Sequence, residues 1–410
     1  MALAVGYMGT KRHLASSVAE VISACPAGPA LDAFAGMCAV GEAIGTSRCV
    51  WNNDAQRFAS EVARALFTSS SVLPTPGQVT NDLYDDFINN KLALQSRFEA
   101  RLKKEESLLS NLDLDEIIVH QSIALHVGNN PELDEERQCL QRDPHLFPYR
   151  LFTITFSDGY FSLAQSIEID SIRYCIDKAC EKSAIEPDQH RWLLIALCQA
   201  AVRVATTTGH FAQYIKPNTN NRSFFYKQRK KSVWQTWIDC LALLTPIGSR
   251  SWRRMNKVFN EDSLILLARA KGFDERPALV YADPPYTDDQ YSRYYHIWET
   301  LTLYDYPASA GAGRYRPDRF QTPFSKKTTV KQAMQELVFL CQSLGSDLVM
   351  SYPDNGLLHK AGAEPLEILR QHYTNVEVSH CINYEHSTMG SSKGTAKLAV
   401  KEFIYWAKSR

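Results

Sequence analysis

The fold is most clearly indicated by residues 278–286, which read Ala-Leu-Val-Tyr-Ala-Asp-Pro-Pro-Tyr. The apolar run at 278–282 predicts a short, buried strand of a parallel sheet. Pro284 and Pro285 then fix the backbone and remove two N–H donors. Free carbonyls, the carboxylate of Asp283 and the ring of Tyr286 are left at the carboxyl edge of the sheet, where ligands bind in open α/β folds. These groups favour a planar ligand ring that carries an exocyclic amino group.

The exocyclic amino group of adenine or cytosine is a weak nucleophile, because its lone pair is delocalised into the ring. Asp283 and the carbonyl of Pro284 can accept its two hydrogens, and Tyr286 can stack on the base. A methyl donor held in line would complete the site by orientation. The alternative is a Pro-Pro turn with an incidental Asp and Tyr, and four residues alone do not decide between the two.

A second motif lies near the start of the chain. Residues 30–34 are predicted to form a strand, followed by a turn through Gly36, a helix, and a second strand over residues 48–51. Asp54 follows this strand 22 residues beyond Asp32, near the spacing expected of a ribose-binding carboxylate. Alternatively, the glycine turn permits close helix packing and Asp54 caps the next helix.

Two shorter segments are weaker signals. Residues 6–12 contain two glycines around an aromatic residue, and this turn can present Lys11 to a carboxylate or phosphate. It can equally be the solvated basic start of a helix over residues 13–25. Asp262 can accept a hydrogen bond from the adenine amino group of a cofactor, or it can cap the helix that begins at Ser263.

Taken in order, these segments resemble the adenine-specific DNA methyltransferases. The similarity consists of a Tyr-x-Gly-x-Lys start, a Phe-x-Gly turn, an Asn-Asp strand end, a later Asn-x-Asp and finally Asp-Pro-Pro-Tyr. This is the order of the subgroup whose cofactor motifs come first, the recognition segment second and the catalytic motif last. Residues 347–352 and 401–406 resemble two further core strands of that family.

The resemblance implies a doubly wound, Rossmann-like α/β sheet with a large, mainly helical inserted lobe. It implies S-adenosyl-L-methionine as the methyl donor and the exocyclic N6 of an adenine in DNA as the target, reached after base flipping. Two positions depart from the family pattern: Cys38 stands at the second glycine of the turn, and Thr10 stands before Lys11 in place of glycine. The resemblance assigns Tyr7 and Lys11 to the methionine portion and active site, Asp32, Phe34 and Gly36 to the cofactor turn, Asp54 to the ribose, Asp262 to the cofactor adenine, and Asp283, Pro284, Pro285 and Tyr286 to the catalytic pocket.

Three segments are expected from this order. Residues 1–68 form the cofactor-binding half of the core, residues 69–250 a helical insertion that recognises DNA, and residues 251–410 the catalytic half. Within the insertion, apolar residues at helical spacing predict helices over residues 87–112 and 162–183, and a further helix is expected over residues 189–208.

The charge of the chain balances, with 45 Lys and Arg against 45 Asp and Glu, which argues against indiscriminate binding of polyanions. Two local runs, residues 222–231 and 249–257, instead mix cations with aromatic residues and contain no acids. The pattern is typical of a surface that binds double-stranded DNA, although charge runs are usually solvated faces. The predicted DNA contacts are Arg222, Lys227, Arg229, Lys230, Lys231, Arg253 and Arg254.

The ten cysteines include no Cys-x-x-Cys pair, so no metal site is expected. With no signal peptide they are interpreted as reduced cytoplasmic thiols, and no segment is expected to span a membrane. A restriction endonuclease is a possible partner, and the oligomeric state is open. Three other functions stay open: methylation of cytosine N4, methylation of adenine in RNA, and a module that binds cofactor or DNA without turnover. Asp at position 283, where Ser would point to cytosine, favours adenine through the resemblance.

Overall fold

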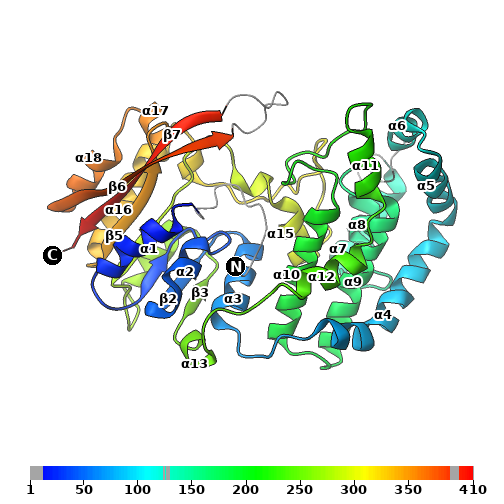
Figure 1. Ribbon diagram of the computed structural model, residues 1–410, viewed down its shortest axis with the longest axis horizontal. Helices are drawn as coiled ribbons and strands as arrows, with labels where there is room; N and C mark the ends of the chain where they lie inside the picture. The colour runs from blue at the N-terminus through cyan, green and yellow to red at the C-terminus, as the bar shows by residue number, and fades with distance from the viewer. Residues whose placement is uncertain (1–12, 123–124, 126–129, 388–396, 410) are drawn as a thin grey trace. The chain divides into compact units, whose positions relative to one another are not determined.

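The computed structural model describes residues 13–122, 125, 130–387 and 397–409 (Figure 1). These residues divide into two compact units. We call the first the sheet unit; its described residues lie within 13–69, 246–291 and 320–409. We call the second the helical unit; its described residues lie within 70–245 and 292–319.

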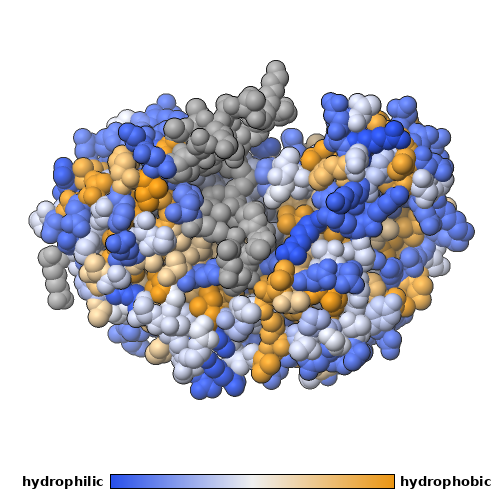
Figure 2. Space-filling view, in the orientation of Figure 1, coloured by the Kyte–Doolittle hydropathy of each residue, from blue (hydrophilic) through white to orange (hydrophobic). Residues whose placement is uncertain are grey.

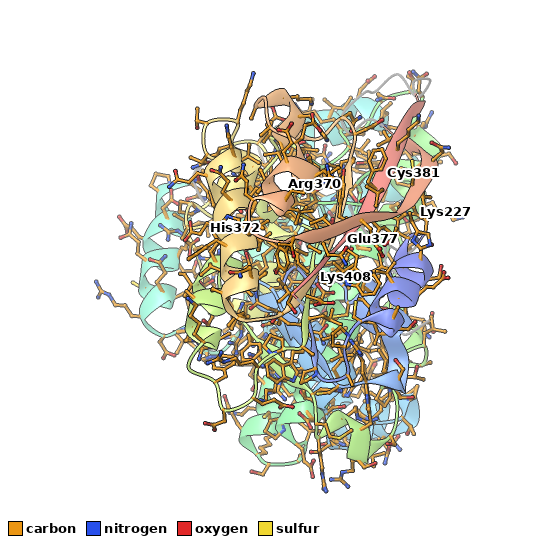
Figure 3. All side chains as sticks on the ribbon, turned by 90° about the vertical axis from the view of Figure 1, so that its left-hand side faces the viewer. Lys227, Arg370, His372, Glu377, Cys381 and Lys408 are labelled. Carbon is orange, nitrogen blue, oxygen red and sulfur yellow. The ribbon has the colours of Figure 1, made fainter. Side chains whose placement is uncertain are left out.

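The sheet unit contains, among the described residues, one seven-stranded sheet with the strand order β3-β2-β1-β4-β5-β7-β6. Strands β3, β2, β1, β4 and β5 run parallel to one another, while β7 pairs antiparallel with both β5 and β6. The strands are β1 (Ala30–Asp32), β2 (Val50–Asn53), β3 (Lys257–Phe259), β4 (Leu279–Ala282), β5 (Asp347–Pro353), β6 (Asn375–Ser387) and β7 (Lys397–Lys408). At the β6–β7 edge, Glu377 and Lys408 form an ion pair with an N–O distance of 3.1 Å (Figure 3).

Helices cover this sheet on both faces, which explains why the central strands β1, β2, β4 and β5 are buried throughout. On one face, Leu31, Trp51, Val280 and Leu348 form a core cluster with residues of α14, α16 and α18. On the other face, α1 contacts β5, while α2 and α3 contact β2. The helices of this unit are α1 (Ala15–Ala24), α2 (Ala39–Ile44), α3 (Arg57–Thr68), α13 (Arg250–Arg253), α14 (Ser263–Ala270), α16 (Val330–Ser343), α17 (Leu357–Lys360) and α18 (Pro365–Arg370).

The helical unit is built around α9, in which 14 of the 19 residues are buried. Two indole N–H groups fasten neighbouring helices to α10: Trp237 donates to the Leu193 carbonyl at 2.9 Å, and Trp298 donates to the Cys198 carbonyl at 2.7 Å. The helices are α4 (Pro76–Arg97), α5 (Glu99–Asn111), α6 (Leu114–Ser122), α7 (Pro131–Arg142), α8 (Leu151–Thr155), α9 (Leu163–Glu181), α10 (Pro187–Val204), α11 (Arg222–Arg229), α12 (Val233–Leu241) and α15 (His296–Leu303).

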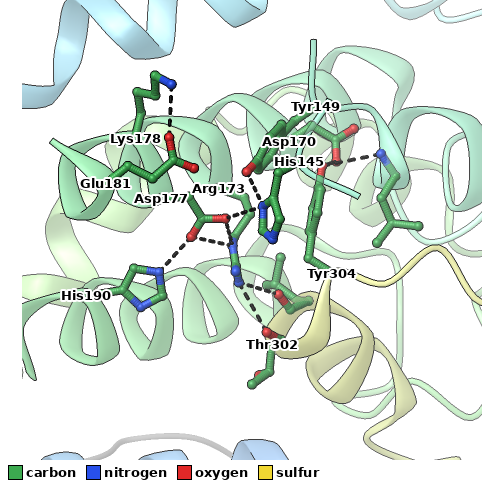
Figure 4. A network of polar contacts seen from close by, with 12 residues as sticks. His145, Tyr149, Asp170, Arg173, Asp177, Lys178, Glu181, His190, Thr302 and Tyr304 are labelled. Atoms are coloured by element: carbon green, nitrogen blue, oxygen red, sulfur yellow. Dashed lines mark hydrogen bonds and ion pairs between the residues drawn. The ribbon is translucent and has the colours of Figure 1, made fainter. Parts of the chain in front are cut away.

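A polar network on α9 holds this core together (Figure 4). Asp177 accepts from Arg173 at 3.0 Å and forms an ion pair with His190 at 2.6 Å. Burial alone would raise the pKa of Asp177, but Arg173 and His190 outweigh it and lower that pKa to about 2. Two turns earlier, Asp170 accepts from the Tyr304 hydroxyl at 2.6 Å and from two backbone N–H groups at the start of α8. Both buried carboxylates are therefore fully engaged in structural contacts.

The expected mixed α/β architecture is confirmed by the sheet. The helix expected over residues 87–112 is instead two helices, α4 and α5, which meet at Phe98. The helix expected to reach residue 208 ends at Val204. Residues 292–319 belong to the helical unit, beyond the expected 69–250 segment. The expected segment limits, and the role of the helical unit as a DNA-recognition lobe, stay predictions.

Among the described residues, no helix combines the length and the apolar character needed to cross a bilayer. In the same part of the chain, no group of three or more His, Cys, Asp or Glu side chains is arranged to hold a metal ion.

Candidate active site at the carboxyl ends of β1, β2 and β4

Three acidic residues follow neighbouring parallel strands. Asp32 ends β1, Asp54 follows β2, and Asp283 follows β4. Strand β1 lies between the other two, with Asp32 in register with Asn52 on one side and Tyr281 on the other. Because parallel strands present their carboxyl ends at one edge of the sheet, the three carboxyl groups converge there.

The carboxylate of Asp54 holds the glycine turn that follows β1. Its Oδ2 accepts the Gly36 N–H at 2.9 Å, and its Oδ1 accepts the Gln56 N–H at 2.8 Å. The Asn260 side chain donates to the Asp54 carbonyl at 2.8 Å, which ties the end of β2 to the segment after β3. Asp54 is thus a structural anchor of the turn, and its predicted contact with a ribose is a separate role that stays a prediction.

The turn requires left-handed backbone at two residues, with φ of 49° at Gly36 and 61° at Cys38. Glycine adopts this region at no steric cost, whereas cysteine is strained there. Burial raises the pKa of the Cys38 thiol well above its ordinary value, so the side chain is a neutral, packed group. The departure from the family pattern therefore keeps the conformation of the turn, at a cost in backbone strain.

Asp32 is 3% exposed and accepts the Phe34 N–H at 3.2 Å. Burial raises the pKa of its carboxyl to about 8; the Phe34 N–H opposes this rise, and the neighbouring carboxylates of Asp283 and Asp54 add to it. The negative charges of Asp54 and Asp283 therefore act on Asp32, and Asp32, the least exposed of the three acids, keeps its proton at neutral pH.

Asp283 is partly exposed, and a buried hydroxyl holds it. Ser351 on β5 donates to Asp283 Oδ1 at 3.3 Å, and its oxygen lies 2.8 Å from the hydroxyl of Tyr281 on β4. Ser351 has one hydrogen, so when it donates to Asp283 it accepts from Tyr281. The result is a chain of hydroxyls aimed at the carboxylate that follows β4.

The rest of the Asp-Pro-Pro-Tyr motif is packed into the sheet unit. The Tyr286 carbonyl accepts the Leu357 N–H at 2.8 Å, and the Tyr286 ring, 8% exposed, lies edge-on to Tyr352 with ring centroids 6.5 Å apart. Pro284 is buried and Pro285 is partly exposed. Stacking of a base on Tyr286 stays a prediction.

The other predicted cofactor residues have different outcomes. Phe34 is partly exposed and lies edge-on to Phe324, with ring centroids 5.4 Å apart. Asp262 caps α14, because its Oδ1 accepts the Leu264 N–H at 2.9 Å. This is the capping role that the sequence left open, and a contact with a cofactor adenine stays a prediction. Tyr7 and Lys11 lie outside the described residues.

The basic residues separate into exposed and buried groups. Hydrophilic side chains lie at the surface over α11 (Figure 2). Within the two basic runs, Arg222, Lys227, Lys230 and Arg254 are exposed, and Lys231 is partly exposed with its Nζ 2.9 Å from the Arg203 carbonyl.

Arg229 and Arg253 are buried, and this corrects the prediction that they contact DNA. Arg229 donates to the Gly159 carbonyl, and burial lowers the pKa of its guanidinium. Arg253 donates to the carbonyls of Ser69 and Gly248 at 2.8 and 2.6 Å. Both guanidinium groups satisfy backbone acceptors inside their own units, so neither is available for a phosphate.

Residues 157–339 match the family model of the D12 class N6 adenine-specific DNA methyltransferases. The match includes the Asp-Pro-Pro-Tyr motif, and the resemblance inferred from the motifs is confirmed.

Curated relatives agree with this match. The chain is 25% identical to modification methylase LlaI of Lactococcus lactis subsp. lactis over 67% of its own length and 41% of that protein. It is 27% identical to type II methyltransferase M.FokI of Planomicrobium okeanokoites, over 52% of the chain and 29% of that protein. It is also 27% identical to type II methyltransferase M.NlaIII of Neisseria lactamica, over 44% of the chain and 50% of that protein. The matched segments thus span about half the length of these methyltransferases or less.

Sequence reasoning missed Ser351 and Tyr281 as neighbours of the Asp-Pro-Pro-Tyr motif. Tyr281 lies in a strand that was predicted from its apolar run, and Ser351 lies in one that was inferred from the family resemblance. Only the pairing of β4 with β5 brings the two hydroxyls together. The available signal was the polar residue inside each run, at the strand position that shares a face with Asp283.

Proposed function

We propose that this protein transfers a methyl group from S-adenosyl-L-methionine to the exocyclic N6 of an adenine in DNA. The observation that carries the proposal is the partly exposed Asp283 carboxylate, held by Ser351 at the edge of the sheet where Asp32 ends β1 and Asp54 follows β2. The match to an N6 adenine-specific family over residues 157–339 supports the choice of adenine.

The acidic set suits a cationic cofactor. The pKa of the Asp32 carboxyl is raised to about 8, first by burial and then by Asp283 and Asp54. Negative charge on any one of the three acids therefore disfavours negative charge on the others. A sulfonium and an amino group placed beside them would relieve that repulsion. Bound S-adenosyl-L-methionine supplies an electrophilic methyl group. The residues proposed to hold it are Asp32, Phe34, Gly36, Asp54 and Asp262, together with Tyr7 and Lys11 outside the described residues.

Asp283 and the carbonyl of Pro284 are proposed to accept the two hydrogens of the adenine N6. These contacts hold the amino group in one orientation and stabilise the positive charge that develops on the nitrogen as it is alkylated. The nitrogen becomes acidic during this change, so an acceptor at hydrogen-bonding distance is sufficient to take its proton. Tyr286 would stack on the ring, and the adenine has to leave the duplex to reach the site.

Double-stranded DNA is the proposed partner, with the exposed cations Arg222, Lys227, Lys230 and Arg254 as phosphate contacts. A cognate restriction endonuclease is a further proposed partner, because relatives of the chain are named as type II methyltransferases. A cytoplasmic location agrees with ten free cysteines.

A methyl-transfer assay with unmethylated genomic DNA and radiolabelled cofactor tests the proposal, and sequencing of the product identifies the modified base. Asp283→Ala should lose turnover and still bind the cofactor in calorimetry. Asp274→Ala, at an acid shortly before β4, is the matched control and should keep full activity. Full activity of Asp283→Ala would contradict the assigned role. A product modified at cytosine N4, or activity confined to RNA, would replace the adenine target; no transfer to any of these substrates would leave a binding module.

A further inference from the structure

Two arginines of the helical unit share one tyrosine ring. Cζ of Arg319 lies 4.7 Å from the Tyr315 ring centroid, and Cζ of Arg293 lies 5.5 Å from it. Arg293 Nε also donates to the Tyr315 hydroxyl at 3.0 Å, and Arg319 Nε donates to the Arg316 carbonyl at 3.0 Å. All three side chains are partly exposed. An aromatic ring that holds two guanidinium groups fixes both charges at one place on the surface.

Tyr315 is itself held rigidly, so the arrangement is built in advance of any ligand. Its hydroxyl donates to the Ala212 carbonyl, and its backbone N–H and carbonyl pair with those of Ala310, both at 2.9 Å. Its ring lies edge-on to the buried ring of His296, with centroids 4.9 Å apart. Burial lowers the pKa of His296 to about 3, so this ring is neutral and the positive charge here comes from the arginines.

Asp305 and Asp318, two acids of the helical unit, are bound by Arg316. Arg316 binds the carboxylates of Asp305 and Asp318 through two hydrogen bonds each, at 2.8 to 3.1 Å. In the part of the chain that the structure describes, Arg319 has no carboxylate ion pair; its contacts are the Tyr315 ring and the Arg316 carbonyl. Burial lowers the pKa of the Arg319 guanidinium, and the nearby charge of Arg293 lowers it further. Two neighbouring cations that repel each other favour an anion that contacts both.

A loop with exposed polar side chains is fastened to the same tyrosine. Ala212 accepts the Tyr315 hydroxyl and is followed directly by exposed Gln213. The preceding residue, Phe211, donates its N–H to the Tyr294 carbonyl at 2.9 Å, and the His210 ring lies 5.0 Å from the ring of Tyr294. A glutamine amide is a side chain that reads base edges in a DNA groove. Its position next to the arginine pair points to a nucleic-acid backbone as the source of the anion.

We propose that Arg293, Tyr315 and Arg319 form a binding site for a backbone phosphate of the DNA substrate, with both guanidinium groups directed at the phosphate oxygens. The site rests on the proposed function, since its ligand is the DNA on which the methyltransferase acts. It adds to the exposed basic residues of α11 a pair of cations whose geometry is set by a shared ring.

The test is DNA affinity as a function of salt, measured with the full chain, a fluorescein-labelled duplex and S-adenosylhomocysteine. Over a range of about 50 to 200 mM NaCl, Arg319→Ala should weaken binding and reduce the slope of log K against log [salt] by about 1, the value for one lost phosphate contact. Arg319→Gln, which keeps a long polar side chain without its charge, should give the same reduction. Lys103→Ala, at a 72% exposed lysine of the same unit, removes one charge away from the site and should keep the wild-type slope.

Equal slopes for Arg319→Gln, Lys103→Ala and the wild type would overturn the phosphate site and leave the proposed function intact, provided that the wild type binds and methylates DNA. If the wild type binds no DNA, the proposed function fails and this site fails with it. Thermal unfolding of each variant shows whether it is folded, so loss of binding through unfolding is recognised as such. Arg293→Gln, which removes the other guanidinium group at the Tyr315 ring, supplies an independent measurement of the salt slope.

Discussion

Removal of the Ser351 hydroxyl tests the proposed catalytic geometry most directly. Register places Val349 of β5 opposite Tyr281 and Met350 opposite Ala282, so Ser351 continues the pairing towards Asp283. Its side chain is fully buried, donates to Asp283 Oδ1 at 3.3 Å and lies 2.8 Å from the Tyr281 hydroxyl. Ser351→Ala removes both contacts and with them one restraint on the orientation of the carboxylate. Ser351 is a positioning residue, since it acts on the substrate only through Asp283.

The size of the effect follows from these contacts. A hydrogen bond to a charged group contributes about 1.5–3 kcal/mol, and the length of 3.3 Å favours the lower end. A loss of about 1–2 kcal/mol in transition-state stabilisation corresponds to a decrease in kcat of roughly 5- to 30-fold. KM for DNA should stay within about twofold, because the hydroxyl makes no proposed ground-state contact with DNA.

Single-turnover methyl transfer measures the chemical step without product release. Tyr281→Phe should cause a smaller decrease in the rate, because Ser351 can still donate to Asp283 when the Tyr281 hydroxyl no longer donates to Ser351. The double variant should be no slower than Ser351→Ala alone, since both changes act through one chain of hydroxyls. Ser343→Ala, which removes a partly buried serine hydroxyl on α16, is the control and should leave the rate unchanged. A wild-type rate for folded Ser351→Ala, or a change confined to KM, would refute the positioning role.

Three other changes test the electrostatics and packing around the same sheet. The folded protein keeps a proton on Asp32 up to about pH 8, whereas the unfolded chain loses it near pH 4. The free energy of unfolding of the wild type therefore falls as the pH rises through this interval. Asp32→Asn should be more stable than the wild type by at least about 1 kcal/mol at pH 8 but not at pH 4. Urea unfolding at both pH values measures this, and a gain independent of pH would contradict it. Gly41→Ala should lose about 1–3 kcal/mol in urea unfolding because its Cβ would lie 2.8 Å from the Phe67 ring, whereas Gly77→Ala, with open space around it, should lose nothing. Arg253→Ala should lower the melting temperature and leave the salt slope of DNA binding unchanged. Arg254→Ala should leave the melting temperature unchanged and reduce the salt slope. Equal effects of the two would reject the distinction between buried and exposed arginine.

The strands near the site could be predicted because they are buried on both faces. An apolar run such as residues 278–282, with two prolines close behind it, is typical of a buried strand that ends at a turn, and β4 occupies residues 279–282. The convergence of Asp32, Asp54 and Asp283 was also predictable, since successive parallel strands end at one edge. The contact between Ser351 and Asp283 was not, because it depends on which strand pairs with β4, and the sequence separates the two residues by 68 positions.

Charge patterns were a poorer guide than apolar patterns, for a physical reason. A run that mixes arginine with aromatic residues looks the same whether its guanidinium groups face water or bind backbone carbonyls inside the protein. Whether each arginine is buried depends on a carbonyl far away in the sequence: that of Gly159 for Arg229 and that of Ser69 for Arg253. Arg319 escaped notice for the converse reason, because Asp318 directly precedes it in the sequence. The carboxylate of Asp318 binds Arg316 instead, and the Arg319 guanidinium lies over the Tyr315 ring.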